Sequence, residues 1–244
     1  MTSPDTPTIP IRSDTLVSIK ARVMRTVRLG PQIEAPFKLS ERFLRRHINE
    51  RLRMAVLIAD IAESTRLSLE LPSKILATVI QVFSQEMALL VIGHGGYVLK
   101  YVGDAVLSFF PAEYNPTIAC TTAAKCAINM MSIVNDAINP ALIEMGYPSI
   151  HTKIGIDFGQ NLIMIYGKSN EESYVDIIGP AVSMASKITS IAGARQLIVG
   201  QDAYAMLDEE IKGKFVEFNV NTYRWGFIDP VTRDPYKLYL YSPY

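Results

Sequence analysis

Two aspartates, Asp60 and Asp104, stand where a sheet can present carboxylates to a metal ion. Asp60 ends the run Met54–Ala59, which is short and apolar throughout and therefore predicts a buried strand. Asp104 follows Gly103 between the two β-rich halves of 97–110, and a Gly-Asp pair there predicts a hairpin. A strand end and a hairpin tip can meet at one sheet edge, where two carboxylates would bind Mg²⁺ or Mn²⁺ and clamp a triphosphate. Taken alone, either aspartate is more typical of an ordinary turn, and the two together favour the metal site.

The segment after Asp60 predicts a phosphate site beside these carboxylates. Residues Ser64 to Glu70 predict a turn into a helix, and the free backbone N–H groups at a helix start attract phosphate oxygens. Ser64 and Thr65 are also typical of simple helix capping, which is compatible with phosphate binding. A longer helix is expected over 73–91, where apolar residues recur at helical spacing.

Four blocks of this sequence, in this order, resemble the catalytic domain of class III nucleotidyl cyclases, the adenylate and guanylate cyclases. They are VLIADIAESTRL at 56–67, GGYVLKYVGDAVLSFF at 95–110, Thr152–Ile163 and Tyr174–Gly200. The resemblance covers roughly residues 52 to 242. It implies an α/β (α+β sandwich) fold with a ferredoxin-like βαββαβ core and a mixed sheet, which fits the alternation of strand and helix patterns.

The resemblance also assigns a metal set and a base-reading pair. Asp60 and Asp104, with Ile61 beside them, match the positions that hold two Mg²⁺ or Mn²⁺ ions. Lys100 matches a position that is Lys in adenylate cyclases and commonly Glu in guanylate cyclases, and Asp176 matches its partner. A Lys donor and an Asp acceptor suit adenine N1 and N6, whereas guanine presents the opposite pattern. The alternative for Lys100 is a strand lysine whose side chain reaches solvent. The alternative for Asp176 is an ordinary acidic residue in a loop.

Two positions depart from the family pattern. The Asn that holds the ribose falls on Ser183, and the Arg that neutralises charge on the α-phosphate falls on Lys187. Serine is shorter and lacks the amide, and lysine keeps the charge but loses the planar fork of arginine. Because losing one preorganised donor typically costs about 10²–10³ in rate, this pair predicts a slow enzyme or none. Arg195 and Ser186 are neighbouring residues that could supply the missing contact.

A third family element is a basic residue near the C-terminal hairpin that touches the triphosphate. It falls on Arg233 or Arg224, within the hairpin expected over Phe215–Tyr241. The Lys-Gly pattern of the family is missing there, and a solvated turn arginine is the favoured alternative. With Ser64 and Thr65, Arg233 completes the expected substrate contacts.

The charge of the chain is neutral overall but uneven. Its hydrophobic content of 49% and charged content of 20% are typical of a soluble globular protein, and nothing global indicates nucleic-acid binding. Residues 1–53 hold eleven Lys and Arg against five Asp and Glu, a net charge of +6. We expect this segment to be a solvated helical extension that helps the chain dimerise. Contact with lipid headgroups or an acidic partner is the alternative.

Three regions are expected along the chain: a disordered tail at 1–14, a basic helical extension at 15–51 and the catalytic domain at 52–244. The extension contains helical patterns at Thr15–Val27 and Ser40–Arg51. The elements expected after it are strand 54–60, helix 73–91, hairpin 97–110, helix 117–138, strands 151–158 and 161–166, helix 180–191, strand 196–199, helix 201–208 and a terminal hairpin.

The sequence indicates a cytoplasmic location. No uninterrupted apolar run approaches the roughly 18 residues that a bilayer span needs, and Met1–Pro7 is polar, with no signal-peptide core. Cys120 and Cys126 lie about 240° apart around one predicted helix, so they cannot easily pair with each other. We expect both thiols to be reduced and structural.

The leading hypothesis is therefore an enzyme that converts ATP to 3′,5′-cyclic AMP and pyrophosphate with two divalent ions. The resemblance implies a homodimer, in which Asp60 and Asp104 of one chain face the base-reading and transition-state positions of the other. Ser183 and Lys187 favour a second hypothesis, an inactive cyclase-like module that binds nucleotide or acts through dimerisation. A third hypothesis is a cyclase with the same reaction whose substrate carries guanine or a pyrimidine in place of adenine.

Overall fold

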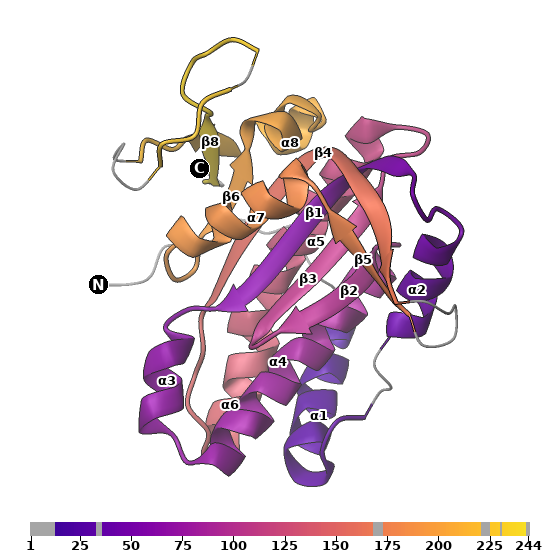
Figure 1. The fold of residues 1–244 in the computed structure, drawn as a ribbon. Helices are drawn as coiled ribbons and strands as arrows, with labels where there is room; N and C mark the ends of the chain where they lie inside the picture. The colour runs from indigo at the N-terminus through magenta and orange to yellow at the C-terminus, as the bar shows by residue number, and fades with distance from the viewer. Residues whose placement is uncertain (1–12, 33–35, 168–172, 221–224, 230, 243–244) are drawn as a thin grey trace.

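A single mixed sheet organises the described part of the chain (Figure 1), a computed structural model in which residues 13–32, 36–167, 173–220, 225–229 and 231–242 are described. Its eight strands run in the order β2-β3-β1-β4-β6-β8-β7, and β5 pairs with β4 outside that path. The strands are β1 Arg51–Ile61, β2 Tyr97–Val102, β3 Ala105–Pro111, β4 Thr152–Tyr166, β5 Tyr174–Ile178, β6 Leu197–Gly200, β7 Phe215–Glu217 and β8 Leu238–Tyr241.

The chain order confirms the expected ferredoxin-like core with a mixed sheet. β1, α4, β2, β3, α5 and β4 follow one another as βαββαβ, and β6 alone of the described strands joins its neighbour β4 in parallel. The helices are α1 Ser13–Leu29, α2 Phe37–Arg45, α3 Ser64–Glu70, α4 Ser73–Gly93, α5 Pro116–Ile133, the π-helical segment η1 Val134–Ile138, α6 Asn139–Glu144, α7 Pro180–Ile191, α8 Gln201–Ala205 and α9 Glu209–Lys212.

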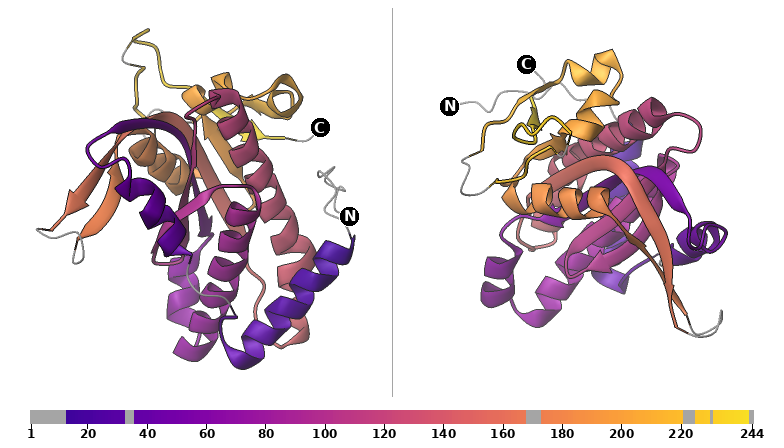
Figure 2. Two further views of the ribbon diagram at one scale, coloured as in Figure 1. Left: turned by 90° about the vertical axis from the view of Figure 1, so that its right-hand side faces the viewer. Right: turned by 45° about the horizontal axis from the view of Figure 1, so that its top comes forward.

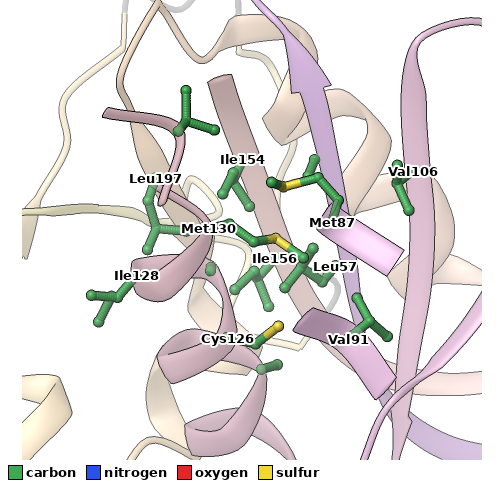
Figure 3. Close-up of a cluster of buried hydrophobic side chains, with 14 of the residues drawn as sticks. Leu57, Met87, Val91, Val106, Cys126, Ile128, Met130, Ile154, Ile156 and Leu197 are labelled. Atoms are coloured by element: carbon green, nitrogen blue, oxygen red, sulfur yellow. The ribbon is translucent and has the colours of Figure 1, made fainter. Parts of the chain in front are cut away.

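Both faces of β1 are buried, which is why its sequence is apolar throughout rather than alternating. Leu57 points to the face covered by α4 and α5, where it packs with Met87, Cys126 and Ile156 (Figure 3). Its neighbour Val56 points to the opposite face, which is covered by α2 and α7. This double burial fixes the end of β1 rigidly, and Asp60 stands at that end.

The N-terminal extension packs against its own domain on both sides (Figure 2). α1 lies against α4 and α6 with Val23 fully buried, and Arg22 donates two hydrogen bonds of 2.8 and 2.6 Å to the buried carboxylate of Glu86. On the other side, the Ser40 hydroxyl of α2 donates to the carbonyl of Val98 in β2. The basic residues of these helices therefore do not all face solvent.

Several expected elements differ from the structure. The helix expected over 40–51 ends at Arg45, because the chain turns with a positive φ of 67° at Asn49 and enters β1 at Arg51. The two strands expected at 151–158 and 161–166 are one continuous strand, β4. Its partner β5 was not expected as a strand. The hairpin at 97–110 and the helix at 180–191 are confirmed.

By length and composition alone, α4 and the stretch Pro116–Glu144 are apolar enough to cross a membrane. Both pack against the sheet, and 44% and 67% of their most apolar windows are buried inside the protein. The core helices of globular domains pass the same test, so this is weak evidence for a membrane span. Cys120 and Cys126 lie on the buried side of α5 as free thiols.

Candidate active site

The two aspartates meet, as the sequence predicts, but at the end of the neighbouring interior strands β1 and β3 and not at an edge strand of the sheet. β1 pairs with β3 up to Ala59 and Val106, so the turn before β3 lies beside the end of β1. Gly103 takes a positive φ of 63° in that turn and presents Asp104. The backbone N–H of Ile61 then donates to the Asp104 carboxylate at 3.2 Å.

The carboxyl group of Asp60 is electrostatically strained in this position. Burial, and then a hydrogen bond with Asp104 and the charge of Asp104, raise the pKa of Asp60 to about 6. The ammonium of Lys153 acts in the opposite direction and lowers it. Two adjacent carboxylates that resist sharing negative charge are the kind of site that a divalent cation stabilises.

Lys153 is the site residue that sequence reasoning missed. It stands directly opposite Asp60 in the β1–β4 register, and its Nζ lies 3.1 Å from Asp60 Oδ2. Both side chains are about one-fifth exposed, at 20% and 19%. The pairing joins segments more than ninety positions apart, so its register could not be read from either segment alone.

The donor set fits a magnesium or manganese site that the substrate completes. In the part of the chain that the structure describes, no cluster of three or more His, Cys, Asp or Glu residues is present. Asp60 and Asp104 supply two hard carboxylates, and the backbone of Ile61 lies between them. Mg²⁺ is commonly held by one or two carboxylates together with substrate phosphates and water.

The start of α3 differs from the expected capped helix. Glu63 is its N-cap residue, in the left-handed conformation at φ 59°, and no side chain caps the helix. Ser64 and Thr65 lie in the first turn, half-buried and exposed respectively. Because β1 leads directly into α3, these residues remain close to Asp60 in the chain, and neither of them caps the helix.

Lys100 and Asp176 also meet, and they do so within one chain. Lys100 comes from β2 and Asp176 from β5, and Lys100 Nζ lies 2.5 Å from Asp176 Oδ2. The other carboxylate oxygen of Asp176 accepts the N–H of Ile177 at 2.9 Å. The spacing of the sequence gave no sign that β5 would bring this acid to β2.

A cavity of about 500 Å³ opens beside this pair, between α2, β2 and β5. Its walls are mainly apolar, with a few polar groups, and it falls within the size range of small-molecule sites. The residues that line it are Phe37, Ser40, Glu41, Leu44, Leu99, Lys100, Ser173, Tyr174 and Val175. Lys100 Nζ also lies 5.9 Å from the centre of the Tyr174 ring.

Among the described residues, no hydrogen bond or ion pair joins Ser183 or Lys187 to Asp60 or Asp104 of the same chain. Ala181 and Ala185 bury the inner face of α7 against the sheet, and Ser183 and Lys187 lie exposed on its outer face. Arg195, by contrast, lies at the end of the sheet where Asp60 is. Its N–H donates to Thr152, and its Nε lies 3.3 Å from His151 Nδ1.

Arg233 is also remote from the aspartates within one chain. The described part of the β7–β8 connection lies at the end of the molecule opposite α3 and the β2–β3 turn (Figures 1 and 2). Arg233 itself takes a positive φ of 67° in a turn whose N–H bonds back to Asp229. Arg224, the other candidate, lies outside the described residues.

Residues 48–224 match the family described as the adenylate and guanylate cyclase catalytic domain. This match covers most of the chain and includes β1, the β2–β3 hairpin and α7. The chain belongs to this cyclase family. The resemblance seen in the sequence motifs is thereby confirmed, and the domain is a nucleotidyl cyclase domain.

Similar proteins carry several base specificities in their names. A uridylate cyclase from Burkholderia cepacia is 27% identical over 68% of this chain and 71% of its own length. A cytidylate cyclase from Escherichia coli is 27% identical over 62% of this chain, and the match spans 35% of that protein. The adenylyl cyclase CyaB from P. aeruginosa shares the fold, with a TM-score of 0.65 and 22% identity over 79% of this chain and 94% of that one.

Proposed function

We propose that the protein converts an adenine or cytosine nucleoside triphosphate into its 3′,5′-cyclic monophosphate and pyrophosphate. ATP is the first candidate and CTP the second. The observation that carries the cyclase assignment is the meeting of Asp60 and Asp104 at the end of the neighbouring strands β1 and β3 in a cyclase-family domain. The cytoplasmic location expected from the sequence stays a prediction.

The aspartates would hold two Mg²⁺ or Mn²⁺ ions, which supply charge neutralisation at the phosphates and a lowered pKa of the ribose 3′-hydroxyl. The 3′-oxygen attacks the α-phosphorus in line, the bond from that phosphorus to the β-phosphate oxygen breaks, and the hydroxyl proton passes to solvent. Asp60 and Asp104 fix where the α-phosphate sits. Their rigid setting on β1 and the hairpin keeps that position constant during the reaction.

Lys100 and Asp176 would read the base. Adenine presents an acceptor at N1 and an amino donor at N6, and cytosine presents the same pair at N3 and N4. Lys100 can donate to the ring nitrogen and Asp176 can accept from the amino group. Guanine and uracil present the reverse pattern, so the pair favours ATP and CTP over GTP and UTP. The cytidylate cyclases among the similar proteins support CTP as the alternative.

The working enzyme would be a homodimer. Ser183 and Lys187 are exposed on α7 and form no hydrogen bond or ion pair with Asp60 or Asp104 of their own chain, which supports a second copy that brings them to the substrate. A two-fold symmetric pair would carry two equivalent sites.

Product analysis tests the proposal. The full chain is incubated with Mn²⁺ and each of ATP, CTP, GTP and UTP, and products are identified by mass, with Asp60→Ala as the metal-site control. Cyclic AMP or cyclic CMP, absent from the control, is the expected result. Cyclic GMP or cyclic UMP alone would overturn the base assignment and leave the cyclase assignment standing.

A second candidate function is a nucleotide-binding module without turnover. Ser183 and Lys187, which replace the family's Asn and Arg, favour it. It predicts that the folded protein binds triphosphate in the presence of Mn²⁺ and yields no cyclic product from any of the four nucleotides.

A further inference from the structure

Strand β2 has one residue more than its partner β3 just before Lys100. Val98 of β2 pairs with Ser108 of β3. Two residues further along β2, Lys100 pairs with Leu107, which is only one residue further along β3. Leu99 is therefore an extra residue, a β-bulge, and a bulge bends the strand and changes the direction of the neighbouring side chains.

This bulge decides which face of the sheet Lys100 reaches. In a regular strand the side chains alternate between the two faces, so Val98 and Lys100 would point to the same one. In the structure, Val98 is buried in the cluster under α4 and α5, whereas Leu99 and Lys100 both line the cavity beside α2. A β2 strand without the bulge would therefore turn Lys100 away from Asp176, its ion-pair partner.

A serine of α2 holds the backbone at the bulge. The Ser40 hydroxyl donates a hydrogen bond to the carbonyl of Val98, and the two residues are only 2% and 1% exposed. Among the described strands, β2 pairs with β3 alone, so no strand supports its other side. Because a bulge disrupts the ladder locally, a donor from a neighbouring helix can fix the backbone there. Removing that donor leaves a buried carbonyl without this partner.

The same helix also holds β2 on the far side of Lys100. The ring of Phe37 packs edge-on against that of Tyr101, with 5.1 Å between the ring centroids. Helix α2 therefore contacts β2 both before and after Lys100, and the contact from Ser40 is the one at the bulge.

We propose that Ser40 is a positioning residue for base recognition: its hydrogen bond to Val98 fixes the bulge that turns Lys100 toward the base. This inference rests on the proposed function, in which Lys100 donates to the ring nitrogen of adenine or cytosine. Such a donor must be held within about half an ångström of its productive position. Loss of the Ser40 hydroxyl lets the bulge relax, so it weakens binding of adenine and cytosine nucleotides selectively.

Equilibrium binding to the full-length protein, measured by calorimetry with Mn²⁺, tests this. The ligands are the 3′-deoxy forms of ATP, CTP, GTP and UTP, which lack the attacking hydroxyl, and inorganic tripolyphosphate, which has no base. Ser40→Ala removes the hydroxyl, and Ser40→Cys keeps the side-chain size with a weak donor. Ser132→Ala is the matched control, because Ser132 of α5 is 4% exposed and its hydroxyl donates within its own helix. Thermal melting checks that each variant folds.

We expect Ser40→Ala to bind the adenine and cytosine nucleotides about fivefold more weakly than wild type. The guanine and uracil nucleotides and tripolyphosphate should bind with wild-type affinity, and Ser132→Ala should resemble wild type throughout. Ser40→Cys should show the same selective loss, and it is the test protein if Ser40→Ala does not fold. An unchanged base preference overturns the proposal, and so does an equal loss of tripolyphosphate affinity, which would show a general structural effect.

A second requirement is that Ser40 acts through Lys100. In a Lys100→Met protein, Ser40→Ala should weaken binding of the adenine nucleotide by less than about twofold, because no ammonium is left to position. A loss as large as that seen with Lys100 present would mean that Ser40 acts independently, and would overturn the proposal.

Failure of this inference is distinguishable from failure of the proposed function. A wild-type protein that prefers adenine and cytosine, with Ser40 variants that keep this preference, refutes the role of Ser40 alone. A wild-type protein that binds all four nucleotides equally refutes base reading by Lys100 and Asp176, and this inference with it.

Discussion

At the scale of single residues, the close approach of Asp60 and Asp104 opposes stability at the position proposed to bind metal. Asp60 is largely buried, and its raised pKa of about 6 shows that the fold resists its negative charge. Asp104 increases that resistance through its own charge. Lys153 offsets part of this cost through its ion pair with Asp60, and a divalent cation bound by both carboxylates would offset more.

Asp104→Asn should therefore weaken Mn²⁺ binding without destabilising the folded protein. The change removes one carboxylate ligand, so Mn²⁺ binding should be lost or weakened by at least about tenfold. The metal-free protein should melt at the same temperature as wild type or slightly higher, because Asp60 loses a like-charged neighbour. Calorimetry and thermal melting measure the two effects. A variant that keeps wild-type Mn²⁺ affinity would falsify the metal assignment.

Restoring the family residues at Ser183 and Lys187 should raise turnover. Both side chains are exposed on α7, so Ser183→Asn with Lys187→Arg should change stability by less than about 0.5 kcal/mol. If these positions limit the rate, kcat should rise by about 10²–10³ while KM changes less, because they act on charge that develops during cyclisation. The two changes should be non-additive, since they serve one substrate.

The rate of the wild-type protein decides how this result is interpreted. A kcat already near ~1–10 s⁻¹, with no gain from the double change, would mean that another residue has taken over. Arg195 is the first candidate, because it lies at the same end of the sheet as Asp60, and Arg195→Ala should then lose the activity.

At the scale of elements, α2 closes one side of the cavity beside Lys100. Hydrogen bonds hold this helix in place at two residues. The Ser40 hydroxyl donates to the backbone of β2, and the Arg45 guanidinium donates to the hydroxyl and the carbonyl of Ser173 at 3.1 and 2.8 Å. Residues 48–224 match the cyclase family, so this helix lies outside the matched region. The helix therefore gives the cavity beside Lys100, the proposed base site, a wall that lies outside the matched region.

Arg45→Met should loosen that wall and reduce base selectivity. The change removes the bonds to Ser173 and keeps much of the side-chain volume, so the cost in stability should be about 1 kcal/mol. Competition binding should show the preference for ATP and CTP over GTP and UTP narrowing by about threefold or more. Arg42→Met, an exposed change on the same helix, is the control. An unchanged ranking in Arg45→Met would show that α2 has no part in base recognition.

Elements encoded by local pattern could be predicted from the sequence, and those set by tertiary contacts could not. β1, the 97–110 hairpin and α7 follow from an apolar run, a Gly-Asp turn and helical spacing. The segment around Gly159 and Asn161 has the composition of a turn, yet it lies inside β4. The reason is that Asn161 is fully buried and bonds to Gly159 and to the N–H of Val182.

The same distinction applies to the site. Asp60 and Asp104 could be predicted to meet, because one ends a strand and the other lies in a hairpin turn. The approach of Lys153 to Asp60 and of Asp176 to Lys100 depends on the registers of β4 and β5, which only the folded sheet defines. These two contacts pair opposite charges at the proposed metal and base positions.

At the scale of the whole molecule, the proposed site is divided between two copies. Mixing two inactive variants should therefore restore activity. Asp104→Asn removes the metal position, and Asp176→Asn removes the base-reading acid. Random pairing makes half of the dimers mixed, and each mixed dimer carries one intact site, so about a quarter of wild-type activity should return. No recovery after mixing, with dimers present, would place the complete site within one chain.

The C-terminal part of the molecule is tied to the central sheet through a buried acid. Asp157 of β4 is 1% exposed, and the Tyr236 hydroxyl lies 2.9 and 3.0 Å from its two carboxylate oxygens. Burial raises the pKa of Asp157 to about 8, and the hydrogen bonds from the Phe158 backbone and from Tyr236 only partly oppose this. At neutral pH the folded protein therefore holds a proton here that the unfolded chain releases.

This proton makes the stability of the protein fall as pH rises. Below about pH 4 the carboxyl is protonated in both states, and between about pH 4 and 8 only the folded state keeps the proton. The free energy of unfolding should thus decrease through this window, by up to about 1.4 kcal/mol per pH unit for one group, and level off above about pH 8. Asp157→Asn cannot ionise, so its urea unfolding free energy, measured from pH 5 to 9, should show a flatter slope than that of wild type. Equal slopes in the two proteins would mean that Asp157 is ionised in the folded state, and that the Tyr236 hydroxyl and backbone N–H groups stabilise its charge fully.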